Sequence, residues 1–273
     1  MPKLIFEKNF KLILLISILV IIFYRSPYIL LNGRFFAEEG SFWFRNSYLF
    51  GPVKGLTQVF WYSSYFNIWP NIATVFASFV PLEYSPFVTV YFAFIVKFYL
   101  FIFIIYSQSN FIVSNFDKLI ISLIVLLAPP MVASVWLNTL TSQVYFTILV
   151  ILIFFQKNVS NSIFNKFSHI ILLISGLSSI LPCALSPFFF YRYLKNKNKF
   201  NLINFIIIFL TTLFQSGIFL YSKIQNLAAM GDYTRFILSY DKITNFTYNV
   251  LIKSFFGRNL TQEIYYNFLY KID

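Results

Sequence analysis

Apolar residues fall into long runs along the chain, and polar residues gather in the shorter stretches between them. A helix needs about 20 apolar residues to cross a hydrocarbon core about 30 Å thick. Most of the runs approach that length, so the pattern predicts about seven transmembrane segments. These segments cover approximately residues 10–31, 67–80, 87–106, 119–136, 140–155, 168–191 and 202–221.

Two of the predicted segments are irregular. The run over 67–80 is short for a span, and the aromatic residues 60–62 before it suit an interfacial belt that would lengthen it. The run over 168–191 contains Pro182 and Pro187, and proline removes a backbone donor and kinks or breaks a helix. We therefore expect either a broken helix or a tight hairpin there, and the sequence leaves both open.

The composition indicates the class of protein. Of the 273 residues, 59% are hydrophobic and 11% are charged, and the mean hydropathy is +0.73. A typical soluble domain is about 25% charged, and a single soluble core cannot bury so much apolar surface. The bilayer is then the main solvent. We expect an all-α fold: a polytopic helical membrane protein with an extracytoplasmic first loop.

The basic residues indicate an orientation in the membrane rather than nucleic-acid binding. The net charge is +12, and in a membrane protein such an excess anchors cytoplasmic loops and attracts anionic lipid. Membrane lipid is therefore an expected partner, and nucleic acid is not. Lysines precede the first run, and basic residues at 192–199 follow the sixth run, which places both regions on the cytoplasmic side.

This orientation divides the chain into two parts. Residues 1–221 form the predicted helical transmembrane domain, and residues 222–273 form a polar extracytoplasmic tail or incomplete loop. The composition is rich in Ile, Phe, Asn, Lys and Tyr, which is typical of an AT-rich bacterial genome. We therefore expect an integral protein of the bacterial inner membrane.

The candidate chemistry lies just after the first hydrophobic run. Only five acidic residues occur in the first 230 positions, and two of them, Glu38 and Glu39, are adjacent. Carboxylates next to a bilayer are costly, so they need water, a partner or a chemical role. If residues 35–46 form a helix along the interface, Glu38 lies near Arg45 and Glu39 lies near Trp43.

These residue types suit sugar transfer outside the membrane. A carboxylate accepts the proton of an acceptor hydroxyl, an arginine holds a phosphate through a bidentate fork, and an indole packs on a sugar ring. Two alternatives stay open. The two carboxylates together are candidate ligands for a divalent metal, or they simply cap an interfacial helix near its positive N-terminal end. The sequence indicates no other cofactor.

A resemblance adds to these residues. The stretch after the first run reads Gly33-Arg34-Phe35-Phe36-Ala37-Glu38-Glu39-Gly40-Ser41-Phe42-Trp43-Phe44. It resembles the first extracytoplasmic loop of bacterial polytopic proteins in the GT-C glycosyltransferase superfamily. The resemblance implies an inverting transfer from a polyprenyl-phosphate-linked sugar, with an acidic residue of this loop as general base. Glu39 and Glu38 are the candidates in the matching position, Glu39 being preferred by a small margin. The substrate-binding candidates in this loop are Arg34, Arg45 and Trp43.

Two later stretches resemble the same kind of protein. Asn138-Thr139-Leu140-Thr141-Ser142-Gln143 is similar to a polar joint between short helices, and it adds Asn138 and Gln143 as substrate-binding candidates. Gly176-Leu177-Ser178, with the prolines that follow, is similar to a small-residue, proline-broken segment. From the residue types alone, hydrogen bonding between helices explains the polar joint more simply than substrate binding does.

These observations favour a membrane glycosyltransferase whose acceptor is a cell-surface glycan or lipid. Members of the superfamily usually have more spans, so we expect a truncated or split gene product, a smaller set of spans that suffices, or a partner membrane protein that completes the fold. The alternative is a transport or assembly protein, such as a flippase or polymerase component, and Arg25 and Lys97 within the runs favour it. An inactive fragment is the third alternative.

Overall fold

The computed structural model describes residues 2–25, 27–127, 136–157, 163–225 and 227. Within these ranges the regular elements are helices, and none is a strand. In chain order they are α1 (Pro2–Arg25), α2 (Pro27–Asn32), the π-helical turn η1 (Glu39–Phe44), α3 (Arg45–Phe50), α4 (Pro52–Thr57), the 3-10 turn η2 (Trp61–Ser63), α5 (Ile68–Ala77), α6 (Ser85–Tyr106), α7 (Asn115–Leu127), α8 (Ser142–Phe154), α9 (Ile163–Ser178), α10 (Ile180–Cys183), α11 (Ser186–Lys195) and α12 (Lys199–Ile224).

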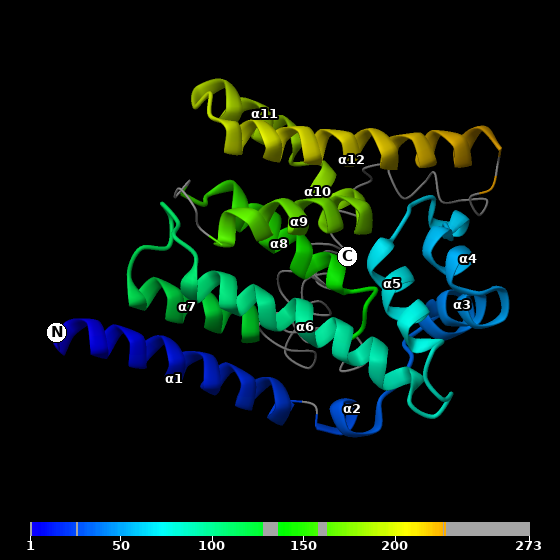
Figure 1. Ribbon diagram of the computed structural model, residues 1–273, viewed down its shortest axis with the longest axis horizontal. Coiled ribbons are helices and arrows are strands. Elements are labelled where there is room, and N and C mark those ends of the chain that lie inside the picture. Colours follow the sequence, from blue (N-terminus) through cyan, green and yellow to red (C-terminus); the bar gives the residue numbers. More distant parts are fainter. Residues whose placement is uncertain (1, 26, 128–135, 158–162, 226, 228–273) are drawn as a thin grey trace, which may run out of the picture.

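The longer helices pack side by side in a stack (Figure 1). α1 lies along one edge and packs on α6 and α7, while α6 packs on α8, α8 on α9, and α9 on α12 at the opposite edge. The short helices α3, α4 and α5 gather near one end of α6. The first loop of the chain is therefore built against the end of the helix stack.

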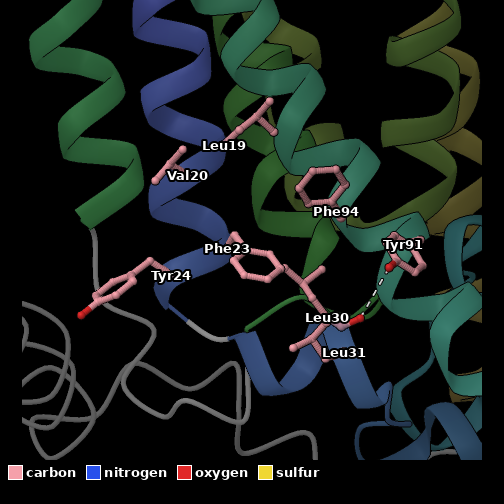
Figure 2. Close-up of a pocket in the computed structure, with 8 residues that line it drawn as sticks. All are labelled: Leu19, Val20, Phe23, Tyr24, Leu30, Leu31, Tyr91 and Phe94. Atoms are coloured by element: carbon pink, nitrogen blue, oxygen red, sulfur yellow. Dashed lines mark hydrogen bonds between the residues drawn. The ribbon is translucent and has the colours of Figure 1, made fainter.

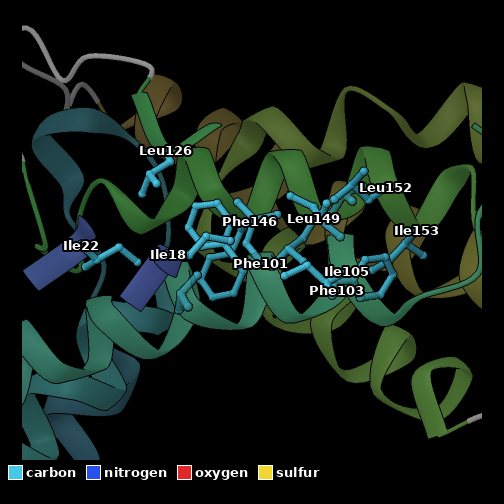
Figure 3. Packing of buried hydrophobic residues seen from close by; sticks show 14 of the residues in the cluster. Ile18, Ile22, Phe101, Phe103, Ile105, Leu126, Phe146, Leu149, Leu152 and Ile153 are labelled. Carbon is cyan, nitrogen blue, oxygen red and sulfur yellow. The ribbon is translucent and has the colours of Figure 1, made fainter. Parts of the chain in front are cut away.

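The core between the helices consists of aliphatic and aromatic side chains (Figure 3). α6 runs through its centre, because apolar residues occupy nearly all of its faces. Side chains of α1, α6, α7 and α8 meet in this core, among them Ile18, Ile22, Phe101, Ile105, Leu126, Phe146 and Leu149.

Two helices in the described part of the chain, α6 and α12, are long and apolar enough to cross a membrane. The segments Phe164–Ser178 and Ile180–Lys195 add a third span if their bend of 115° lies within one crossing. The helices α5 and α8, with 10 and 13 residues, are shorter than the about 20 that a span needs. The expectation of about seven transmembrane segments is therefore not confirmed, and the structure supports two or three.

The predicted run over 168–191 is divided rather than continuous. Its break lies at Ser179, which has an extended backbone with φ −162° and ψ 152°. The Oγ of Ser179 accepts a hydrogen bond from the backbone N of Leu181 at 3.2 Å and so caps α10. Pro182 and Pro187 lie in the first turns of α10 and α11, where a missing N–H costs little. A serine thus divides the run, and the prolines follow the break.

Gln215 of α12 joins three parts of the chain. Its Oε1 accepts a hydrogen bond from the backbone N of Phe66 at 3.1 Å. Its Nε2 donates to Phe66 O at 2.9 Å and to Gly176 O of α9 at 3.1 Å. A Cβ atom at Gly176 would collide with the hydroxyl of Thr211, so α9 and α12 approach closely here. The amide satisfies backbone groups that would otherwise be buried without partners.

A second polar network holds η1, α4 and α5 together. The Nδ2 of Asn71 donates to Leu56 O at 3.0 Å and to Gln58 O at 2.9 Å. The Nε2 of Gln58 donates to Trp43 O at 3.2 Å, and both amide side chains are buried. These bonds satisfy carbonyl groups at and between the ends of short helices, which need partners when water is excluded.

Replacing Asn71 by alanine should lower the free energy of unfolding by about 1–3 kcal/mol, because two buried carbonyl groups lose their donor. Thermal unfolding of the purified protein in detergent measures the effect. The matched control is Asn110→Ala at an exposed position, with an expected change within about 0.5 kcal/mol. Equal losses in the two variants would contradict a specific role for Asn71.

Candidate functional site

The chain changes direction at Gly33, directly after α2. Gly33 has φ +60°, and its backbone N donates to Ile29 O at 3.0 Å, so α2 ends on a left-handed residue. A Cβ atom at this position would lie 2.9 Å from the backbone N of Phe87 in α6. Both the conformation and the close approach require glycine, and together they hold the start of the first loop against α6.

A continuous helix over residues 35–46, the condition considered from the sequence, does not form. Residues 33–36 lie outside any helix, and Ala37 has φ +48°. The backbone N of Phe36 donates to Glu39 Oε2 at 3.1 Å, and Glu39 N donates to Phe36 O at 3.0 Å. These two bonds close a tight turn over residues 36–39, and Glu39 lies at the beginning of η1.

Glu39 connects the first loop to a segment 100 residues away in the sequence. Its Oε1 accepts a hydrogen bond from the backbone N of Thr139 at 3.0 Å and a second one from the Thr139 hydroxyl. The side chain is fully buried, with 0% of its surface exposed. A buried carboxylate is stable when its oxygens accept several hydrogen bonds, and Glu39 accepts them on both oxygens.

The burial of Glu39 shifts the pKa of its carboxyl group. Removal from water disfavours the charged form and raises the pKa of the carboxyl, whereas the hydrogen bonds from Thr139, Phe36 and Thr89 act in the opposite direction. The net pKa lies above the ordinary value of 4.5. Glu39 is therefore a buried acid that several hydrogen bonds hold in one place.

Glu38, by contrast, is exposed. The charge of Glu38 acts on Tyr65, whose pKa is raised chiefly by burial; a hydrogen bond with Asn67 lowers this pKa, and the negative charge of Glu38 raises it. The two adjacent carboxylates thus differ in environment. Glu39 points into the protein, and Glu38 stays accessible beside a phenol.

The other candidates of the first loop lie in three different environments. Arg34 is half-buried, its Nη2 donates to Trp136 O at 3.5 Å, and its guanidinium carbon lies 5.7 Å from the centre of the Phe36 ring. Arg45 is exposed at the start of α3. Trp43 is 1% exposed, with its indole packed against Phe60 at 4.9 Å between ring centres. Trp43 therefore belongs to the packed core of the loop.

The polar joint contains the remaining two candidates. Asn138 is buried, and its Oδ1 accepts a hydrogen bond from the backbone N of Thr141 at 2.8 Å, which shapes the turn before α8. Gln143 is half-buried in the first turn of α8. The contact between Glu39 and Thr139 brings this joint against the first loop. The structure therefore places Asn138 in the same region as the acidic pair.

Sequence reasoning did not find the residues that connect the site. Thr139 lies inside the polar joint but was not a candidate, and Trp136 lies just before the joint. The indole of Trp136 contacts the side chains of Arg25 in α1 and Lys97 in α6. The signal available in the sequence was the presence of Arg25 and Lys97 within apolar runs. No local pattern joins them to Trp136.

An apolar groove lies beside this region, between α1, α2 and α6 (Figure 2). It has a volume of about 460 Å³. The hydroxyl of Tyr91 at its edge donates to Leu30 O at 3.5 Å. Its lining consists of Leu19, Val20, Phe23, Tyr24, Leu30, Leu31, Tyr91 and Phe94.

Comparisons with protein-family models, with curated proteins and with solved structures found no match for this chain. Among the described residues, no group of three or more His, Cys, Asp or Glu side chains is arranged to hold a metal ion. Glu38 and Glu39 are the adjacent acidic pair, and their side chains lie in different environments. The geometry of the described residues is therefore the basis for assigning a function to this site.

The raised pKa of Glu39 predicts a pH dependence of stability. Because the folded state holds this proton more tightly than the unfolded state, the contribution is most favourable below about pH 4.5 and is lost as the pH rises through the raised pKa. The melting temperature of the wild-type protein should therefore fall over this range more steeply than that of Glu39→Gln. The control Glu83→Gln changes an exposed carboxylate and should keep the wild-type slope. Parallel curves for wild type and Glu39→Gln would count against this prediction.

Proposed function

We propose that this chain is a membrane glycosyltransferase that moves a sugar from a lipid-phosphate donor to a cell-surface glycan or lipid. In this proposal the first loop faces the extracytoplasmic side of a bacterial inner membrane, and further crossings beyond the two or three supported spans complete the membrane domain. The donor suggested by the resemblance of the first loop is a polyprenyl-phosphate-linked sugar.

The observation that carries the proposal is the contact between the acidic pair and the polar joint. Two stretches, 33–44 and 138–143, resemble parts of the same superfamily, and the hydrogen bonds from Thr139 to Glu39 bring them together. A site assembled from distant segments, with a buried acid at the point of contact, is typical of a functional centre rather than of simple lipid-facing structure.

The two carboxylates suit different roles. Glu38 is exposed and has the access that a general base needs in order to accept the proton of an acceptor hydroxyl. Glu39 is buried and accepts hydrogen bonds from Phe36 in the first loop and from Thr139 in the polar joint. We therefore assign it the role of positioning the loop. This assignment makes Glu38 the preferred general base, whereas the sequence slightly favoured Glu39 in that role.

Positive charge for the donor phosphate is available on the same loop. Arg34 lies half-buried next to the polar joint, and Arg45 is exposed at the start of α3. A guanidinium group binds phosphate oxygens through parallel N–H donors. The indole of Trp43 is buried and offers no face to a sugar ring, so we assign Trp43 to packing and not to substrate binding.

A transport or assembly role is the second candidate function. The observation in its favour is Lys97, which is fully buried in a candidate membrane span. Charged residues within spans often mark an ion or substrate pathway. In a transporter, loss of Lys97 should abolish movement of the substrate, whereas loss of Glu38 should leave it intact.

The test is sugar transfer in membranes with Glu38→Gln, Glu39→Gln and the control Glu83→Gln, at equal expression. Loss of a general base should reduce the rate by about 10²–10⁴-fold, so we expect such a loss in Glu38→Gln and wild-type transfer in Glu83→Gln. Gel mobility and mass of the surface glycan measure the product.

The positioning role of Glu39 needs a separate comparison. Thr139→Val removes the hydroxyl that donates to Glu39, so it should lower the rate in the same direction as Glu39→Gln. The double variant should be no worse than the more affected single variant, because both changes break one contact. If glycan is unchanged in Glu38→Gln, in Glu39→Gln and in a full deletion, the glycosyltransferase proposal fails.

A further inference from the structure

Lys97 lies at the centre of a group of hydrogen-bond donors inside the helix stack. Its side chain is 0% exposed, and its Nζ donates to the hydroxyl of Tyr145 in α8 at 3.0 Å. The same Nζ lies 2.8 Å from the centre of the Trp136 ring. A lysine ammonium group has three donors, and one of them is used by the phenol.

Arg25 at the end of α1 approaches the same indole. Its guanidinium carbon lies 4.3 Å from the centre of the Trp136 ring, and its Nη1 donates to Leu126 O in α7. Arg25 is half-buried, whereas Lys97 is fully buried. Both basic side chains therefore lie against the same indole ring, and Arg25 is the more accessible of the two.

Trp136 itself provides a third donor. The indole is 2% exposed, and its Nε1 has no hydrogen-bond partner among the described residues. A tryptophan N–H can only donate, and the described residues offer this donor no acceptor. Buried donors without partners are uncommon in folded proteins, and a bound ligand is one explanation for them.

A counter-ion is also missing within the described part of the chain. The contacts of Arg25 and Lys97 there are a backbone carbonyl, a phenol and aromatic rings, and none is a carboxylate. The residues at 128–135, which precede Trp136, include no Asp or Glu in the sequence. Two cations in a low-dielectric interior repel each other and lose their hydration, so an anion close to both would be stabilising.

We propose that Arg25, Lys97 and Trp136 form a binding site for a phosphate-type anion, either the headgroup of a membrane lipid or a free phosphate. A phosphate offers several oxygen acceptors to these donors, and the guanidinium fork of Arg25 fits two of them. Its charge balances the two cations. The accessible end of the site is Arg25, and Lys97 lies at the inner end. This site is independent of the proposed sugar transfer, because it requires neither Glu38 nor Glu39.

Binding is measured on the full-length protein in nanodiscs made of a zwitterionic lipid. The probes are a phosphatidate, the neutral diacylglycerol with the same chains, and inorganic phosphate. We expect the phosphatidate or inorganic phosphate to raise the melting temperature, because a ligand that binds the folded state stabilises it. The diacylglycerol should have no such effect.

Three variants test the assigned residues. Arg25→Gln and Lys97→Met should each weaken the apparent affinity at least tenfold, and Trp136→Phe should weaken it while keeping the aromatic ring. The control is Lys54→Gln, which removes an exposed lysine whose Nζ lies 3.8 Å from the centre of the Phe50 ring. It should leave the affinity unchanged.

Lys97→Met adds a second readout. Without ligand, this variant should melt at a higher temperature than the wild type, because an uncompensated buried charge is replaced by an apolar side chain of similar length. A purely structural role for Lys97 predicts a lower melting temperature. Even if Lys97→Met fails to fold, Arg25→Gln and Trp136→Phe still test the site.

The outcomes separate the sources of the anion. A shift with inorganic phosphate supports a site that takes free anions, and a shift with phosphatidate alone supports a lipid headgroup. An equal shift with the diacylglycerol would overturn the proposal. So would equal weakening in Arg25→Gln, Lys97→Met and Lys54→Gln, since that result indicates general attraction to a basic surface.

Discussion

The buried carboxylate of Glu39 is the interaction on which the arrangement of the site depends. A carboxylate removed from water has to be surrounded by donors, and the donors available to Glu39 come from two loops 100 residues apart in the sequence. The requirement to satisfy one acid therefore fixes the position of the first loop relative to the turn before α8. Glu39 thus joins the first loop to the polar joint, while Gly33 holds the start of the same loop against α6.

The short segment from Trp136 to Thr139 combines two opposite electrostatic environments. At its end, the Thr139 N–H and hydroxyl donate to an acid. At its beginning, the Trp136 ring lies against two cations that contact no carboxylate among the described residues. The Trp136 carbonyl also accepts a hydrogen bond from Arg34. This short segment thus lies between the acidic pair and the two cationic side chains.

The sequence predicted some of this fold well because certain signals are local. Continuous apolar runs placed α6 and α12 close to their observed bounds, and the all-helical class followed from composition. The extent of the first-loop helix was not predictable, because it depends on the turn over residues 36–39 and on the left-handed conformation of Ala37. The contacts of Thr139 and Trp136 were not predictable, since tertiary packing alone brings them to Glu39 and Lys97. The sequence showed that residues 138–143 are polar, but it did not show that they contact Glu39.

Gln215 has a consequence for how the helix stack can move. Its amide holds the backbone of Phe66 and of Gly176 at the same time, and the amide fits these groups at one axial position of α12. Sliding α12 by a single helical turn would break all three hydrogen bonds in an apolar interior. Such a lock couples α12 to α9 and to the loop around Phe66. Any conformational cycle in this protein would have to pivot elsewhere, with α9, α12 and the loop around Phe66 moving as one body.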